Sequence, residues 1–244
     1  TNAPLSHVLA QTAFVLPGEL NFLLGSDETL QTGIAETARD FEQKTTDYWR
    51  QWTRRLALPL EWQDAVIRAA ITLKLSLYED TGAIIAAMTT SIPEAPGSSR
   101  NWDYRYCWLR DAFFVVRALN SLSEVATMED YLRWMSNVVI DSQGGHIQPL
   151  FGIGLEKSLP ESFVDNLPGY RGMGPVRVGN QAQEHFQHDV YGNVILGAAQ
   201  AFHDHRLLHR AGAREFRALE RVGEQAVRVF DQPDAGMWLS LIHI

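Results

Sequence analysis

The residues that point most clearly to chemistry lie in the segment that ends at Asp111. Within ten positions, Trp102–Asp111 holds four aromatic residues, two arginines and two aspartates, where a long connection meets a predicted helix. Aromatic rings stack on the C–H faces of sugars, and Arg and Asp side chains hydrogen-bond to sugar hydroxyls. The segment therefore predicts carbohydrate recognition. The alternative is that the rings are core residues and that Arg110 and Asp111 form a helix cap or an ion pair.

A second segment, Gly169–Asn180, is rich in glycine and precedes a predicted helix that carries Glu184 and Asp189. Its glycine spacing matches neither the phosphate-binding P-loop nor the dinucleotide fingerprint, and no predicted strand leads into it. We expect no nucleotide site here. A turn-rich connection without function is the alternative interpretation, and Glu184 and Asp189 are interpreted as structural.

Several histidines raise the question of a metal site. His185 and His188 are three residues apart on one predicted helix, but no cysteine partner and no HExxH-type motif accompanies them. No G-x-S-x-G motif that would mark a serine nucleophile occurs either. We expect neither a metal nor another cofactor.

The composition narrows the class of protein. The 244 residues carry 21 Lys and Arg against 29 Asp and Glu, a net charge of −8, and 45% of them are hydrophobic. A chain this apolar is folded, and its acidity and lack of basic clusters argue against nucleic-acid binding. No apolar stretch approaches the roughly 20 residues of a membrane span. The single cysteine, Cys107, excludes an internal disulfide, so we expect a cytoplasmic rather than a secreted protein.

Apolar residues spaced three and four apart predict the elements that position these segments. Such stripes predict five amphipathic helices, at 62–77, 108–122, 128–139, 186–202 and 216–230. A longer polar helix is expected from about residue 30 to 56, and apolar bursts on either side of Pro17 and Gly18 predict two strands between Leu5 and Gly25. The long connections 82–107 and 144–183 are where function is expected. No fixed repeat period supports a helical-repeat scaffold.

Five motifs occur here in the order typical of bacterial members of glycoside hydrolase family 15. They are Thr89–Glu94, Arg100–Asp111, Tyr170–Asn180, Asp189–Gly192 and Pro233–Trp238. The resemblance covers the chain from Leu5 to Trp238, and the block from Asn101 to Asp111 is its most specific part. The family contains glucoamylases, glucodextranases and some trehalases.

The resemblance implies a mainly α-helical fold, an (α/α)6 barrel preceded by a β-sandwich. Residues 1–26 are then expected to be the last strands of the β-sandwich domain, and 27–57 a linker helix. Residues 58–238 would form the first half of the catalytic barrel. Residues 239–244 show no turn or helix-capping pattern, and we interpret them as a non-native scar, that is, a remnant of cloning or sequence assembly. The chain is accordingly expected to be a truncated piece of a longer enzyme.

The implied activity is that of an exo-acting, inverting glycoside hydrolase that releases glucose from α-glucosidic bonds at non-reducing ends, as a glucoamylase does. Tyr104 and Trp108 resemble aromatic walls of the glucose subsite, and Arg110 and Asp111 the pair that binds the terminal sugar. Arg171 and Asn180 are weaker candidates. Expected substrates are an α-glucan, maltose or trehalose. The alternatives are an α,α-trehalase of the same family and a non-catalytic sugar-binding helical module.

The resemblance also implies where the catalytic acid belongs. In the family it follows the tryptophan of a Gly-x-Trp-Glu motif, whereas here Gly236-Met237-Trp238 is followed by Leu239. Leucine cannot donate a proton, and the general base belongs to a later segment, so we expect this chain to be inactive. Arg105 and the segment Tyr170–Asn180 are where we expect discrimination between trehalose and other α-glucosides.

Overall fold

The computed structural model describes residues 1–16, 18–26 and 29–236. Contacts within the chain divide it after Leu56 into two compact units. The first unit contains α1 (Leu5–Leu9) and α2 (Ile34–Arg54). The long polar helix predicted from about residue 30 to 56 is confirmed by α2.

The two strands predicted between Leu5 and Gly25 are wrong for the described residues, which form one short helix and no strand there. A strand is stable only when its backbone groups pair with a neighbouring strand, and the local apolar pattern does not supply one. Instead the side chain of Asn2 joins the two ends of the segment: its amide donates to the Glu19 carbonyl (3.0 Å), and it accepts from the Asn21 N–H (2.8 Å). The β-sandwich assignment of residues 1–26 stays a prediction.

The described part of the second unit, residues 57–236, contains five α-helices, and each follows one of the predicted stripes. They are α3 (Gln63–Leu75), α4 (Leu109–Ser121), α5 (Ala126–Ser142), α6 (Asp189–His203) and α7 (Ala213–Val229). All five predicted helices are therefore confirmed, with boundaries that shift by up to three residues. The predicted stripe at 186–202 begins with Phe186, but α6 begins at Asp189 and Phe186 is exposed.

The core of this unit lies where α4, α5 and α6 meet. Tyr131 and Trp134 of α5 are almost fully buried, as are Leu109 and Leu119 of α4 and Val194 of α6. Burying each large apolar side chain contributes roughly 1.5–3 kcal/mol to stability. The amphipathic stripes therefore fix which face of each helix turns inward.

Three short antiparallel strand pairs brace the long connections. β1 (Leu77–Tyr78) pairs with β2 (Ala83–Ile84), β3 (Cys107–Trp108) with β4 (Leu150–Phe151), and β5 (Ser162–Phe163) with β6 (Arg177–Val178). A 3-10 helix, η1 (Gln181–Glu184), follows β6. The β3–β4 pair joins the start of α4 to the connection that leaves α5.

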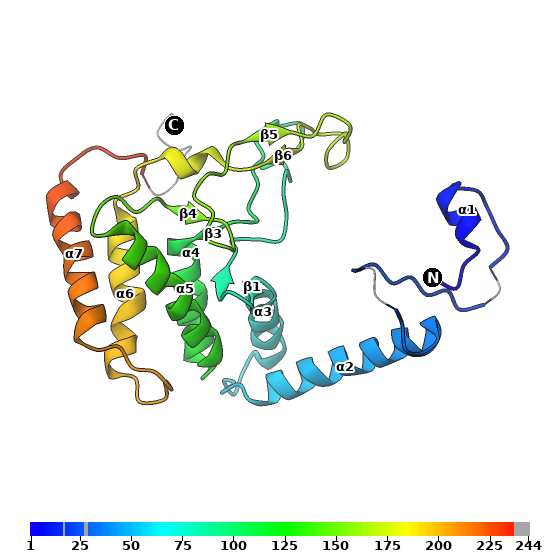
Figure 1. Ribbon diagram of the computed structural model, residues 1–244, viewed down its shortest axis with the longest axis horizontal. Coiled ribbons are helices and arrows are strands. Elements are labelled where there is room, and N and C mark those ends of the chain that lie inside the picture. The colour runs from blue at the N-terminus through cyan, green and yellow to red at the C-terminus, as the bar shows by residue number, and fades with distance from the viewer. Residues whose placement is uncertain (17, 27–28, 237–244) are drawn as a thin grey trace. The chain divides into compact units, whose positions relative to one another are not determined.

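Successive helices of this unit run in opposite directions, so their connections alternate between two ends (Figure 1). α4 and α6 begin at the end where β3–β6 lie, while α5 and α7 finish there. The helical fold class is confirmed. The described helices do not close into a ring, so the (α/α)6 barrel remains an implication of the resemblance.

Candidate functional site

A cavity of about 480 Å³ lies at the end of the second unit where the strand pairs gather. Sites of this size hold small organic ligands. Five of the predicted site residues line it: Tyr104, Trp108, Arg110, Asp111 and Asn180. The remaining lining residues are Ala86, Glu94, Trp102, Glu161, Arg177, Gln181, Ala182 and His185. Residues about 75 positions apart in sequence are thus brought together.

Arg110 and Asp111 stand in the first turn of α4, the position that presents both side chains to the connections above the helix. Nε of Arg110 lies 3.6 Å from Oδ2 of Asp111, and its Nη1 donates to Oδ2 of Asp189 in the first turn of α6 (3.2 Å). The ion pair with Asp189 fixes the guanidinium between two helix starts. Partial burial raises the pKa of Asp111, and the charge of Arg110 opposes that rise.

Tyr104 and Trp108 supply aromatic surface beside this pair. Their ring centroids lie 6.2 Å apart at a tilt of 45°. Trp108 is held by the pairing of β3 with Leu150 of β4 and packs against Leu159 and Ala182, so only a small part of it remains exposed. Burial, followed by the charges of Glu94 and Asp111, raises the pKa of Tyr104, which keeps its hydroxyl protonated as a hydrogen-bond donor.

Asp103 ties the two long connections to each other. Its carboxylate is buried and accepts from Nε and Nη2 of Arg105 (both 2.8 Å) and from the Gly179 N–H (3.3 Å). Its carbonyl accepts from Nδ2 of Asn180 (3.0 Å). A single aspartate therefore fixes the segment before α4 against the segment that carries Asn180.

Gly179 can take its place beside Asp103 only because it lacks a side chain. Its φ of +88° is a left-handed conformation, and an added Cβ would lie 2.0 Å from the carbonyl oxygen of Pro160. Asn180 then caps η1, since its Oδ1 accepts from the Ala182 N–H (3.0 Å). Asn180 therefore lines the cavity while both polar atoms of its side chain support the local backbone.

Two residues that the sequence motifs do not single out, Arg177 and Glu161, also line the cavity. Arg177 lies on β6, and Glu161 directly precedes β5. Nη1 of Arg177 donates to Oε1 of Glu161, and Nε donates to Oδ1 of Asn101 (3.1 Å). The guanidinium also lies over the rings of Trp102 (5.2 Å) and Phe163 (5.1 Å). The signal available in sequence was the arginine at the end of the glycine-rich segment, but its partners are distant in sequence.

The sequence of the chain matches one known protein family. Residues 61–238 match the family described as "Glycosyl hydrolases family 15", which is more than half of the chain. The chain belongs to glycoside hydrolase family 15. The resemblance drawn from its motifs is thereby confirmed.

The relatives of this family 15 chain include proteins named trehalase. It is 36% identical over 212 residues to a trehalase of Mycobacterium tuberculosis, an alignment that covers 83% of this chain and 30% of the relative. It is 34% identical to a trehalase of Thermoplasma volcanium, covering 80% and 30%, and 32% identical to trehalase 1 of Sulfolobus acidocaldarius, covering 80% and 34%. The chain thus spans about a third of the length of these relatives. No solved structure gives a significant match.

Two residues considered from sequence lie outside the cavity of this family 15 chain. Arg171 is exposed, and its guanidinium lies over the ring of Tyr170 (5.3 Å). Its left-handed φ of 53° belongs to a tight turn closed by hydrogen bonds from Gly172 N–H to the Gly169 carbonyl and from Met173 N–H to the Tyr170 carbonyl. Arg105 folds back onto Asp103. Neither is among the residues that line the cavity.

The segment that leads toward the predicted catalytic position is fastened to the start of α6. The Ala235 N–H donates to the Phe186 carbonyl (2.8 Å), and Nε2 of Gln187 donates to the Gly236 carbonyl (2.7 Å). Oδ2 of Asp234 accepts from the His188 N–H (2.7 Å). Residues 237–244, and with them position 239 and the predicted scar, lie outside the described residues.

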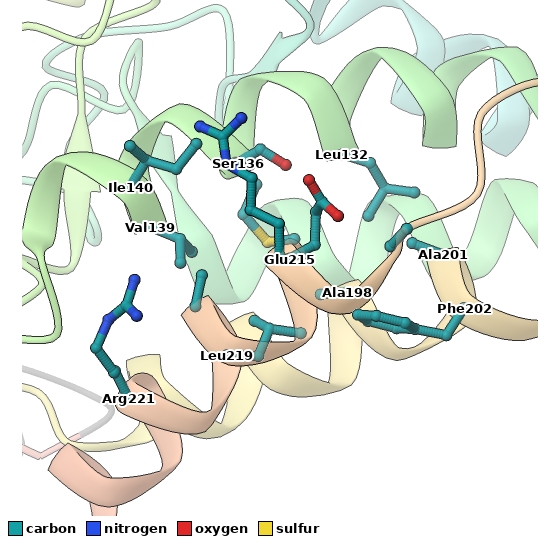
Figure 2. A pocket seen from close by; sticks show the side chains of 14 residues that line it. Leu132, Ser136, Val139, Ile140, Ala198, Ala201, Phe202, Glu215, Leu219 and Arg221 are labelled. Atoms are coloured by element: carbon teal, nitrogen blue, oxygen red, sulfur yellow. The ribbon is translucent and has the colours of Figure 1, made fainter.

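A smaller pocket of about 180 Å³ lies between α5, α6 and α7 (Figure 2). Figure 2 shows mostly aliphatic side chains around it, among them Leu132, Val139 and Leu219. Aliphatic walls offer few hydrogen-bond partners for the hydroxyl groups of a ligand.

Among the residues that the structure describes, no group of three or more His, Cys, Asp or Glu side chains is arranged to hold a metal ion. No helix of the described parts is both long and apolar enough to cross a membrane.

Proposed function

We propose that this chain is part of an inverting α-glucosidic hydrolase that acts on trehalose. The observation that carries the proposal is the juxtaposition of Arg110 and Asp111 with the rings of Tyr104 and Trp108 in one cavity. A charged donor and acceptor beside aromatic surface suit the hydroxyls and the C–H face of one glucose ring.

Family membership and the names of the relatives refine the substrate. A glucoamylase-like activity on starch or maltose was the main expectation from sequence, with trehalase as the alternative. The relatives described above are named trehalase, which favours the alternative. The expected substrate is therefore a disaccharide in which two glucose rings are joined through their anomeric carbons.

The proposed reaction needs two carboxyl groups besides the residues that hold the sugar. One protonates the glycosidic oxygen, and the other, roughly 6.5–9.5 Å away, activates water on the opposite face of the ring. In this scheme Arg110 and Asp111 orient the terminal glucose, a contribution that affects rate as well as affinity. The proton donor is expected at position 239, so the chain as given should bind sugar without hydrolysing it.

The first test is binding of trehalose and maltose to the 244-residue chain, measured by calorimetric titration. We expect tighter binding of trehalose, and a loss of about tenfold or more in Asp111→Asn, because the ionised acceptor is removed. Asp130→Asn is the matched control, since Asp130 forms an ion pair with Arg133 on α5 and does not line the cavity. Tighter binding of maltose, or equal binding by Asp111→Asn and the parent, would overturn the proposal.

A second test separates binding from turnover. The chain incubated with trehalose should release no glucose, whereas the enzyme extended through its natural catalytic segments should release it. Turnover by the chain itself would contradict the role given to position 239. Sugar binding without turnover in the extended protein would favour the alternative of a non-catalytic sugar-binding module.

A further inference from the structure

The cavity contains a second arginine–carboxylate pair besides Arg110 and Asp111. Arg177 and Glu161 are joined by an ion pair, and their side chains are 16% and 20% exposed, close to the 15% of Arg110. Both line the same cavity as Arg110 and Asp111. Arg177 is held by this ion pair, by a hydrogen bond to Asn101 and by two aromatic faces. Its guanidinium is therefore preorganised for a ligand.

The pair also retains unused hydrogen-bonding capacity. Nε and Nη1 of Arg177 have partners, but Nη2 has none among the described residues. Glu161 accepts through Oε1, and its Oε2 likewise has no partner within the described ranges. Two ion-paired residues that line the cavity thus offer a further donor and a further acceptor, a combination that matches neighbouring sugar hydroxyls.

The neighbouring acid, Glu94, does not offer the same capacity. Its Oε1 accepts from Nε1 of Trp102 (2.9 Å), and its Oε2 accepts from Nε of Arg100 (2.8 Å). These two hydrogen bonds lower the pKa of Glu94 and keep it ionised. Glu94 therefore fixes the ring of Trp102, on which the guanidinium of Arg177 rests.

We propose that Arg177 and Glu161 bind the second glucose ring of trehalose. The inference rests on the proposed function and adds the residues that select the substrate. The two rings of trehalose are chemically equivalent and present the same set of free hydroxyls, because the bond joins both anomeric carbons. Two arginine–carboxylate pairs in one cavity therefore match two equivalent rings. In maltose the second ring is joined through one of its hydroxyl oxygens and keeps a free anomeric carbon.

The experiment compares trehalose, maltose and glucose as ligands of the 244-residue chain and its variants. Arg177→Lys keeps the charge that neutralises Glu161 but loses the planar fork, and Arg177→Met removes both. For Arg177→Lys we expect trehalose affinity to fall about tenfold while glucose affinity, held by Arg110 and Asp111, stays unchanged. Arg133→Lys, at an exposed ion pair on α5, is the matched control. Thermal melts identify any variant that fails to fold.

The outcomes separate this inference from the proposed function. If the parent binds trehalose and Asp111→Asn weakens it, but Arg177→Lys and Arg177→Met leave it unchanged, the second-ring assignment fails and the proposed function stands. If glucose and trehalose lose affinity equally in a folded Arg177→Lys variant, Arg177 acts on the first ring and the assignment also fails. If the parent prefers maltose to trehalose, both fail.

Discussion

Replacing Asp103 with alanine should destabilise the second unit and loosen its cavity at the same time. The buried carboxylate accepts the backbone N–H of Gly179 and of Arg105 as well as two guanidinium donors of Arg105. A buried donor left without an acceptor costs about 1–3 kcal/mol. The Arg105 side chain is 44% exposed and regains water, so its ion pair adds only about 0–1 kcal/mol. Together these contributions give an expected loss of about 1–4 kcal/mol.

The assay is urea unfolding followed by near-ultraviolet circular dichroism, combined with trehalose titration at low urea. Asp103→Asn should lose less stability, because its amide oxygen can still accept a backbone N–H. Asp130→Ala, which breaks an exposed pair with Arg133, should cost about 0–1 kcal/mol. If Asp103→Ala is no more destabilising than Asp130→Ala, the hydrogen bonds of Asp103 do not hold the two connections together and the reasoning is refuted.

Two further predictions concern stability. Gly179→Ala should lower the free energy of unfolding, measured in urea, by more than about 1 kcal/mol. The new Cβ would clash with the Pro160 carbonyl, and the backbone at this position is left-handed. An unchanged urea midpoint would contradict this prediction. Hydrogen bonds from Arg206 hold the pKa of Asp204 well below its usual range. Its carboxylate therefore stabilises the fold above the unfolded pKa of about 3.9 and loses that contribution as the pH falls toward the folded pKa. When the pH is lowered from about 6 to about 3, the free energy of unfolding of Asp204→Asn should fall by less than that of the parent. Equal decreases in the two proteins would contradict this prediction.

The helices were predictable because their signal is local. Stripes of apolar residues three and four apart identify buried positions of α4 and α5, among them Leu119, Met128 and Met135, which are almost fully buried. The start of α6 was misplaced because the residues before it bind the segment 234–236 instead of continuing the helix. A contact between residues nearly 50 positions apart leaves no periodic trace in the sequence.

Part of the candidate site was predictable because its residues are close together in sequence. Tyr104, Trp108, Arg110 and Asp111 lie within one short segment, and a motif can report them together. Arg177 acquires its place through contacts with Asn101 and Trp102, which lie far from it in sequence, and with Glu161. A glycine-rich segment predicts a turn, but it does not predict which distant residues the side chain of Arg177 will contact in the folded protein.

The alternating directions of α4–α7 have a consequence for engineering. The candidate site residues gather at one end of these helices, while the turn between α6 and α7 lies at the other, where Leu208 is 82% exposed. Exposed turns are the places at which inserted segments are best tolerated. A linker for surface immobilisation can therefore be joined at this turn, at a point remote from the candidate site.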